Sequence, residues 1–455
     1  MRASPRLPTA LTALSIRAFR RYLLGQLTSN IGTWMQRAAQ DLLVLHLTGD
    51  SGSAVGIVTA LQFLPQTLFG LAGGVLADRC PKQRLLLLTQ TAMAMQSLLL
   101  GLLTATGAVN LLSVYALAFA LGTATAVDGP ARTAYISELV SREHVPTAVS
   151  LNSAQFNLAR ILGPALAGLT VATFGTAPVF LMNAVSYLAV LYALTTLPPP
   201  KPNARAHPHP PRLREAFQSI TTTPDLLLPI GLIAVVGTFG LNFQVTTSLV
   251  AITVFHSGAA AFGYLSAAYA VGSLLGAAYG ASRGKPPSTR RLTTTTVVFG
   301  ALEAALGLMP GYGTFMALLI PTGFAAVTVT TTANALTQLN AAPHLRGRVM
   351  SVYFLVLLGG TPVGAPLTGL VSDTLGARAA LILAGTVSAA AALALPALPA
   401  ARAHRHLETT TTTPATTPPR PTTEEASARA LNPDDQAPSS SSSTADSRTK
   451  ARSST

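Results

Sequence analysis

Between residues 70 and 84 the chain reads Gly70-Leu-Ala-Gly-Gly74-Val-Leu-Ala-Asp78-Arg79-Cys-Pro-Lys82-Gln-Arg84. In this stretch an apolar run ends in a short turn with one acidic and three basic residues. Small residues such as Gly70 and Gly74 let helices approach closely inside a membrane. Basic residues in a short loop between apolar segments mark the cytoplasmic side of a membrane protein. The stretch therefore predicts two membrane helices joined by a cytoplasmic turn.

The composition extends this prediction to the whole chain. Of its 455 residues, 49% are hydrophobic and 10% are charged, and the mean hydropathy is +0.46. A soluble domain keeps about 25% charged residues, so a water-soluble fold is a poor description of this chain. The net charge of +14 would favour a nucleic-acid partner if the basic residues formed one patch. They lie instead in short clusters between long apolar segments, so we expect no nucleic-acid partner.

The sequence offers little for catalysis or for cofactor binding. Cys80 is the only cysteine, so neither an internal disulfide nor a cysteine-based metal site is expected. The phosphate-binding Walker A loop is missing, because Gly284-Lys285 is followed by Pro286. No arrangement of Ser, His and Asp and no pair of carboxylates rises above chance. We expect no enzyme activity, no cofactor and no metal.

Long apolar segments divide the chain. A helix needs roughly 20 mainly apolar residues to cross the hydrocarbon core of a membrane. Short loops with almost no Lys or Arg alternate with basic loops, so both termini are expected on the cytoplasmic side of a bacterial inner membrane. The predicted fold class is an all-α membrane protein. Its twelve predicted transmembrane helices are 19–47, 53–77, 85–106, 110–133, 146–173, 177–197, 226–254, 259–282, 292–309, 312–338, 349–372 and 377–398.

The predicted helices form two groups of six. We expect an N-terminal six-helix bundle at 1–197, a cytoplasmic linker at 198–224 and a C-terminal six-helix bundle at 225–399. The linker is rich in Pro and His and interrupts the apolar pattern. Residues 400–455 contain mainly Thr, Ser, Pro and scattered charges, which cannot bury enough apolar surface to fold. We expect this segment to be a disordered cytoplasmic tail.

The two groups repeat each other in sequence. A shift of 201 residues aligns glycines of the fifth span with glycines of the eleventh, namely Gly163 with Gly364, Gly168 with Gly369 and Gly175 with Gly376. Two six-helix repeats joined by a basic loop are typical of transporters whose halves rock around a site at mid-membrane.

The turn at Asp78 and Arg79 resembles the signature that the major facilitator superfamily carries between its second and third helices, Gly-x-x-x-Asp-Arg-x-Gly-Arg-Arg/Lys. Pro81-Lys82 stands where that family usually has Gly-Arg. The resemblance implies the major facilitator fold of two pseudo-symmetric six-helix bundles. It also implies that Asp78 and Arg79 latch the cytoplasmic side shut. A basic turn that only sets the topology is the alternative.

Further motifs narrow this resemblance. They are Phe19-Arg-Arg-Tyr22, Gly32-Thr-Trp34-Met-Gln36 with Asp41, Asp128-Gly-Pro130-Ala-Arg132, Arg160-Ile-Leu-Gly163-Pro164 and Arg346-Gly-Arg348-Val-Met-Ser351. As a set they resemble the exporter branch that contains the enterobactin exporter and macrolide efflux proteins. The run Gly163-Pro164-x-x-x-Gly168 is similar to the fifth-helix motif of antiporters. The resemblance implies a proton-driven exporter.

The first span carries a polar stripe. Its members are spaced by 4, 4, 3 and 4 residues and therefore share one helical face; they are Gln26, Asn30, Trp34, Arg37 and Asp41. Ionisable groups at membrane depth normally face a cavity or a partner, so this face predicts part of the transport path. Asp41 can exchange a proton, whereas the permanently charged Arg37 cannot. The alternative is an ion pair between the two that only anchors the span.

The fourth and fifth spans contain further charged candidates. Arg160, with Asn157 beside it, is expected in the transport path, either as an anchor for an anionic substrate or as a structural partner for a carboxylate such as Asp128. Asp128 and Arg132 approach the cytoplasmic end of their span, which favours a gating bridge between them. Glu303 in the ninth span is expected outside the cavity.

The second half offers neutral polar groups that could line a cavity, although hydrogen-bonded helix packing is the favoured role. They are Asn242, Gln244, Asn334 and Gln338.

The sequence favours a secondary active transporter that exports a hydrophobic or amphipathic small molecule, such as a drug, siderophore or secondary metabolite, in exchange for protons by alternating access. A nutrient importer and a transport-dead scaffold or sensor are the alternatives. The expected partners are the substrate, protons and the lipid bilayer, and the expected state is a monomer.

The charge distribution of the loops makes the topology testable. Reporters fused after Gly107 and after Lys201 should report opposite sides of the membrane, because the first loop lacks Lys and Arg while the second is basic. Matching signals from paired alkaline phosphatase and fluorescent protein fusions would contradict the assignment.

Overall fold

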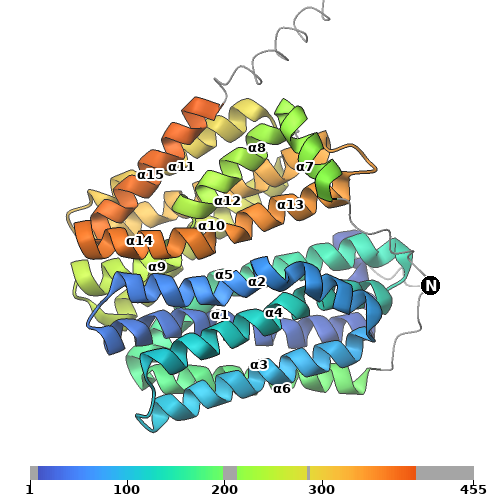
Figure 1. Ribbon diagram of the computed structural model, residues 1–455, viewed down its shortest axis with the longest axis horizontal. Coiled ribbons are helices and arrows are strands. Elements are labelled where there is room, and N and C mark those ends of the chain that lie inside the picture. The colour runs from blue at the N-terminus through green and yellow to red at the C-terminus, as the bar shows by residue number, and fades with distance from the viewer. Residues whose placement is uncertain (1–8, 198–212, 284–286, 396–455) are drawn as a thin grey trace, which may run out of the picture. The chain divides into compact units, whose positions relative to one another are not determined.

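The computed structural model describes residues 9–197, 213–283 and 287–395. Within these ranges every regular element is a helix, and all of them belong to one compact unit (Figure 1). The predicted tail from residue 400 and residues 198–212 of the predicted linker lie outside the described residues.

The first six long helices pack mainly on one another. The helix α1 contacts α5 and α6 most extensively, while α2 packs on α4 and α3 packs on α6. Two short 3-10 helices, η1 (Thr9–Ser15) and η2 (Arg142–His144), precede α1 and α5. The long helices are α1 (Arg17–Thr48), α2 (Gly52–Arg79), α3 (Lys82–Ala105), α4 (Leu111–Leu139), α5 (Val145–Phe174) and α6 (Thr176–Thr196).

Polar caps define where several of these helices begin. The Ser51 side chain accepts a hydrogen bond from the Ala54 backbone at the start of α2, and Asn110 forms a capping box with Ser113 at the start of α4. Such caps satisfy backbone N–H groups that have no partner inside the helix.

The second group is less regular. Its seventh span is broken into α8 (Pro224–Val235), the π-helix η3 (Val236–Gly240), α9 (Phe243–Leu249) and the π-helix η4 (Val250–Val254), and its eleventh span into α13 (Arg346–Gly359) and α14 (Thr361–Leu375). The unbroken spans are α10 (Gly258–Ser282), α11 (Thr289–Gly307), α12 (Tyr312–Asn340) and α15 (Ala377–Ala394). A short helix, α7 (Leu213–Thr222), forms the end of the predicted linker.

Ten helical segments of the described chain are long and apolar enough to cross a membrane. The remaining two of the twelve predicted spans are α1 and α11. The helix α1 is more polar than the ten segments because it contains side chains such as Gln36, Arg37 and Asp41, all of which are buried. The prediction of two six-helix bundles is confirmed.

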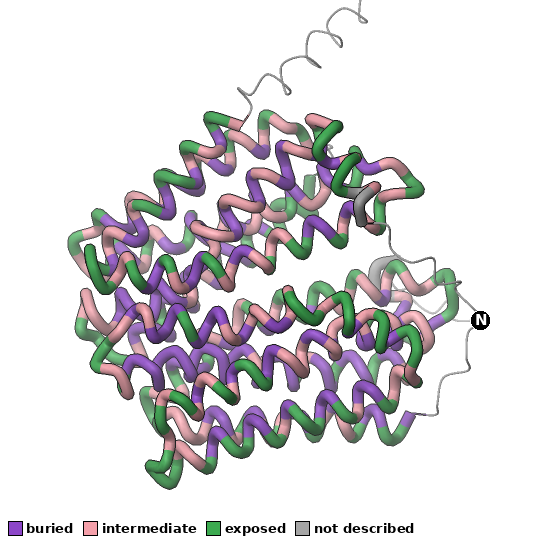
Figure 2. The backbone as a smooth tube through the Cα atoms, in the orientation of Figure 1, coloured by how far each residue is buried: buried purple, intermediate pink, exposed green. Residues whose placement is uncertain are grey.

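The outer surfaces of the bundles are apolar. Large hydrophobic side chains such as Leu68, Leu88 and Leu112 are exposed, and Figure 2 shows exposed and buried positions alternating along the helices. Exposed leucines at this density fit a hydrocarbon environment, in which apolar groups carry no cost.

The internal repeat reappears in the helix boundaries. The helices α4 and α12 begin and end 201 residues apart, and so do α5 and the α13–α14 segment. The equivalent glycines that follow, Gly175 and Gly376, both have a positive φ, 81° and 91°, which glycine adopts without strain.

The two bundles meet where α2 packs on α14 and α5 packs on α10. These contacts lie toward the neutral end, defined here as the helix ends at residues 49–52, 174–176, 255–258 and 375–376, which contain no Lys or Arg. The backbones come so close that a side chain on Gly168 would overlap Gly263, and one on Gly369 would overlap Gly52.

A carboxylate reinforces the contact between α2 and α14. Asp373 accepts hydrogen bonds from the Gly52 and Ser53 backbone N–H groups, at 2.5 and 2.9 Å, and from the Ser51 hydroxyl at 3.3 Å. An acid at the N-terminus of a helix is favourable because the free N–H groups and the helix dipole both attract negative charge. One bundle thus caps a helix of the other.

Gly168→Leu should loosen the neutral end, because the added side chain has no space between α5 and α10. The test uses a protein in which Cys80→Ser removes the native thiol and Thr361→Cys places a new one between the bundles, in the cavity described below. A membrane-impermeant thiol reagent applied from the neutral end should label this cysteine severalfold faster when Gly168→Leu is also present than when it is not.

The close helix approach suggested by the sequence at Gly70 and Gly74 is not found, because a side chain at either position meets nothing within 4 Å. Gly74→Leu is therefore the matched control. Equal labelling of both variants would show that the close contact at Gly168 does not hold the bundles together.

Candidate functional site: a cavity between the bundles

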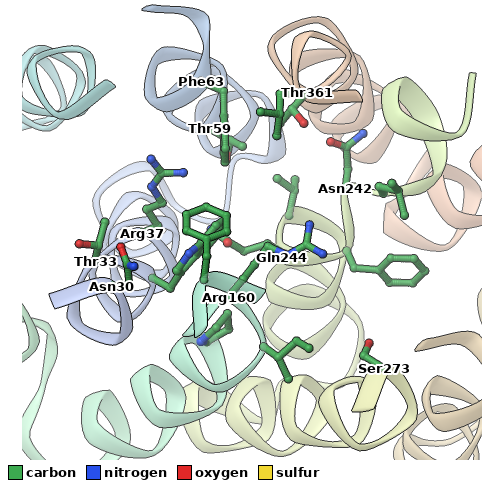
Figure 3. Close-up of a pocket in the computed structure, with 18 of the residues that line it drawn as sticks. Asn30, Thr33, Arg37, Thr59, Phe63, Arg160, Asn242, Gln244, Ser273 and Thr361 are labelled. Atoms are coloured by element: carbon green, nitrogen blue, oxygen red, sulfur yellow. The ribbon is translucent and has the colours of Figure 1, made fainter. Parts of the chain in front are cut away.

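A cavity of about 230 Å³ lies between the two bundles. Helices α1 to α5 contribute side chains from one bundle, and α9, α10, α12 and the α13–α14 segment contribute side chains from the other. Figure 3 shows Asn30, Arg37 and Arg160 on the side of the N-terminal bundle, with Asn242 and Gln244 on the side of the C-terminal bundle. The break in the seventh span at Leu241 and Asn242 therefore borders the cavity.

The polar stripe of α1 reaches this cavity in part. Asn30, Trp34 and Arg37 line it, whereas Gln26 and Asp41 are buried without lining it. The helical spacing read from the sequence thus brings three of the five stripe residues to one site.

Arg37 is held by aromatic rings. Its guanidinium lies 4.5 Å from the ring centre of Phe63 and 5.0 Å from that of Trp34, and its side chain is 3% exposed. Rings attract a cation through their electron-rich faces. Among the described residues Arg37 forms no ion pair, and its buried Nε has no hydrogen-bond partner. The sequence leaves open whether Arg37 and Asp41 form an ion pair. The structure contains no such pair.

Asp41 bonds to the other bundle instead. One carboxylate oxygen accepts a hydrogen bond from Gln244 Nε2 at 2.6 Å, and the other accepts one from Thr59 Oγ1 at 3.5 Å. Thr59 and Gln244 both line the cavity, so the fully buried Asp41 lies directly behind its wall. Gln244, for which helix packing is the favoured role from sequence, is a cavity residue that joins the two bundles.

The α4 pair forms an ion bridge within one bundle. Arg132 binds Asp128 four residues away, and Thr89 and Gln90 donate hydrogen bonds to the same carboxylate at 2.9 and 2.8 Å. Arg132 also donates to Asn30 at 3.2 Å. These partners all belong to the N-terminal bundle, so the observed bridge stabilises that bundle, and its gating role stays a prediction.

Arg160 lines the cavity and forms no hydrogen bond or ion pair with any described residue. Asp128 pairs with Arg132 and not with Arg160, which removes the structural partner considered for Arg160. Asn157 does not line the cavity; it is exposed, and its amide donates to the Ser153 carbonyl at 2.9 Å.

The glycine-proline motif of α5 shapes the wall. Pro164 lines the cavity, Gly163 packs directly on Trp34, and Gly168 contacts Gly263 of the other bundle. The motif thus sets how closely α5 approaches both α1 and α10.

The predicted latch is not engaged in this conformation. Asp78 and Arg79 are exposed at the end of α2, and neither forms an ion pair within the described part of the chain. Lys82 instead binds Glu138 at 3.5 Å, which ties the start of α3 to the end of α4. The latch stays a prediction.

Sequence reasoning missed several lining residues. Phe63 and Tyr269 carry no signal in the sequence, because an aromatic residue in an apolar helix is ordinary. The repeat could have predicted Thr361, because it lies 201 residues after Arg160 and is its equivalent in the second half. Glu303 is buried in the C-terminal bundle and does not line the cavity. No group of three or more metal-binding side chains occurs among the described residues.

Solved structures share the fold. The nucleoside transporter NupG superposes with a TM-score of 0.65 at 14% identity, over 84% of this chain and 98% of that one. A bacterial homologue of the human lysosomal transporter Spinster, in an inward-facing and occupied conformation, gives 0.63 at 15% identity, over 87% and 97%. The arrangement is the major facilitator fold.

Sequence comparisons identify relatives among exporters. The enterobactin exporter EntS of Citrobacter koseri is 26% identical over 359 residues, 77% of this chain and 84% of that protein. The staphyloferrin A transporter of Staphylococcus aureus is 31% identical over 166 residues, 36% of this chain and 42% of that protein. The family model described as transmembrane secretion effector matches residues 8–425. The chain therefore belongs to the transmembrane secretion effector family of the major facilitator superfamily, and it is a multi-pass membrane transporter and not an enzyme.

Proposed function

We propose that this transporter exports a hydrophobic or amphipathic small molecule, such as a siderophore, drug or secondary metabolite, in exchange for protons. The observation that carries the proposal is the position of Asp41, whose carboxylate lies behind the cavity wall and bonds to both bundles. By the positive-inside rule, we place the protein in the bacterial inner membrane with both termini cytoplasmic.

Asp41 suits proton coupling better than the other membrane-embedded acids. Asp128 is bound to Arg132 and to two further donors. Glu303 does not line the cavity and, unlike Asp41, forms no hydrogen bond with a described residue that does. Protonation of Asp41 would remove the charge that Gln244 stabilises, and so would weaken one contact between the bundles. A ligand that changes the free-energy difference between two conformations shifts their populations, and a proton bound at Asp41 would do so.

Alternating access is supported by the distribution of contacts. The close helix crossings and the Asp373 cap are near the neutral end, whereas Asp78 and Arg79 at the opposite end are unpaired within the described chain. Two bundles in close contact near one end, with no ion pair at Asp78 and Arg79 near the other, are consistent with a transporter whose halves rock.

Export of a siderophore-like molecule is supported by the relatives, which include enterobactin exporters and a staphyloferrin A transporter. The cavity combines aromatic rings such as Trp34, Phe63 and Tyr269 with a few polar groups, which is the usual composition of a site for an amphipathic ligand.

Asp41→Asn should abolish uphill transport while leaving the protein folded and able to bind substrate, because an amide has no proton to exchange. Inverted vesicles carrying a substrate found by an efflux panel should show at least about a tenfold loss of pH-gradient-driven accumulation. Substrate exchange without a gradient should persist.

Glu303→Gln is the matched control, since it removes a buried acid that does not line the cavity. Wild-type accumulation by Asp41→Asn would assign Asp41 a purely structural role.

A further inference from the structure

We propose that the substrate of this cavity is an amphipathic organic anion, and that Arg37 and Arg160 bind its negatively charged group. The inference rests on the proposal that the cavity is the transport site, and it does not depend on proton coupling.

The charged side chains that line the cavity are all positive. Among the described residues that line the cavity, Arg37, Arg132 and Arg160 are charged, and none is acidic. Arg132 is neutralised by Asp128. Two guanidinium groups therefore remain without an ion pair in the described chain.

Charged residues in membrane helices face a partner or a water-filled cavity, because a charge in hydrocarbon is costly. Arg37 is buried, whereas Arg160 is exposed and lines the cavity. Asp41 lies one helical turn from Arg37, but its carboxylate bonds to Thr59 and Gln244. Neither guanidinium is ion-paired or hydrogen-bonded to a described residue, so both are available to a bound anion.

The surroundings of Arg37 leave its N–H donors free for a ligand. Its guanidinium stacks on Trp34 and Phe63 and is not held by hydrogen bonds. Stacking fixes the plane of a guanidinium while its N–H groups remain available for an oxygen ligand such as a carboxylate. The ring of Phe156 stands edge-on to that of Trp34, with 5.9 Å between the ring centres. Apolar surface therefore adjoins the Arg37 guanidinium and suits the apolar part of an amphipathic anion.

The repeat sets Arg160 against a neutral residue. Its equivalent in the second half, Thr361, also lines the cavity and is neutral. The charge at this repeat position is therefore present in one half only, which is consistent with a role toward the ligand. An anion also moves outward down a membrane potential that is negative inside, so this substrate class is consistent with export.

The chain provides its own reporter for a test. Trp34 is the only tryptophan, and it lines the cavity, so energy transfer from Trp34 to a dansyl group reports binding at this site. Three probes share one aromatic body and differ in charge: dansylglycine is an anion, dansylamide is neutral and dansylethylenediamine is a cation.

Purified wild-type protein should bind dansylglycine about tenfold or more tightly than dansylamide, and should bind the cation most weakly. Arg160→Gln and Arg37→Gln should each reduce the preference for dansylglycine over dansylamide by about tenfold, and Arg160→Lys should retain part of it. Arg21→Gln, which removes an exposed arginine outside the cavity, should change nothing.

Equal affinity of the wild type for the anion and the neutral probe, or no binding of dansylglycine, would overturn the proposal. An equal loss of all three probes in a monodisperse Arg160→Gln variant would do the same, because it would indicate a structural role. The outcome is separable from that of the Asp41→Asn experiment, since anion preference is measured without a proton gradient.

Discussion

Buried polar groups in α1 constrain the rest of this structure. Residues 34–45 of this helix are all buried, and they include Gln36, Arg37 and Asp41. Hydrocarbon offers no hydrogen bonds, so these side chains must face partners or a cavity inside the protein and not lipid. The helix is therefore surrounded by α2, α4, α5 and α6, and the N-terminal bundle is built around it.

The polar groups of α1 divide between two sides with different roles. On the side away from the cavity, the Gln36 carbonyl oxygen accepts hydrogen bonds from Ser97 and Asn183 at 2.6 and 2.7 Å, and its amide donates to Gln96 at 2.9 Å. This network joins α1 to α3 and α6 within the bundle, and Gln96 Nε2 is its one buried group without a partner among the described residues. On the cavity side Arg37 lacks such partners, and Asp41 accepts one hydrogen bond from Thr59 of the same bundle and one from Gln244 of the other bundle. One face of the helix thus bonds within its own bundle, and another meets the cavity and the second bundle.

The contact between the bundles depends on small residues, and no ion pair joins the two bundles within the described parts of the chain. Glycines 52, 168, 263 and 369 let helix backbones touch, which gives close packing without the side-chain ordering that a salt bridge needs. Asp373 adds one polar cap to this interface. Such contacts can separate at modest cost, as a rocking mechanism requires. The repeat explains their placement, because Gly168 and Gly369 are equivalent positions in the two halves.

The sequence by itself determined the membrane class, the two bundles, the repeat and the polar face of α1. These follow from hydropathy, helical spacing and glycine positions, which act locally along the chain. It also placed Arg160 in the membrane, but it left open whether Asp128 was its partner. Only the tertiary structure decided that Asp128 belongs to Arg132, that Gln244 binds Asp41, and that Arg37 lies against Phe63. A pairing between helices depends on how each helix is rotated and how deep each residue lies, and many pairings satisfy the same periodicity. Packing of all the helices at once selects one of them.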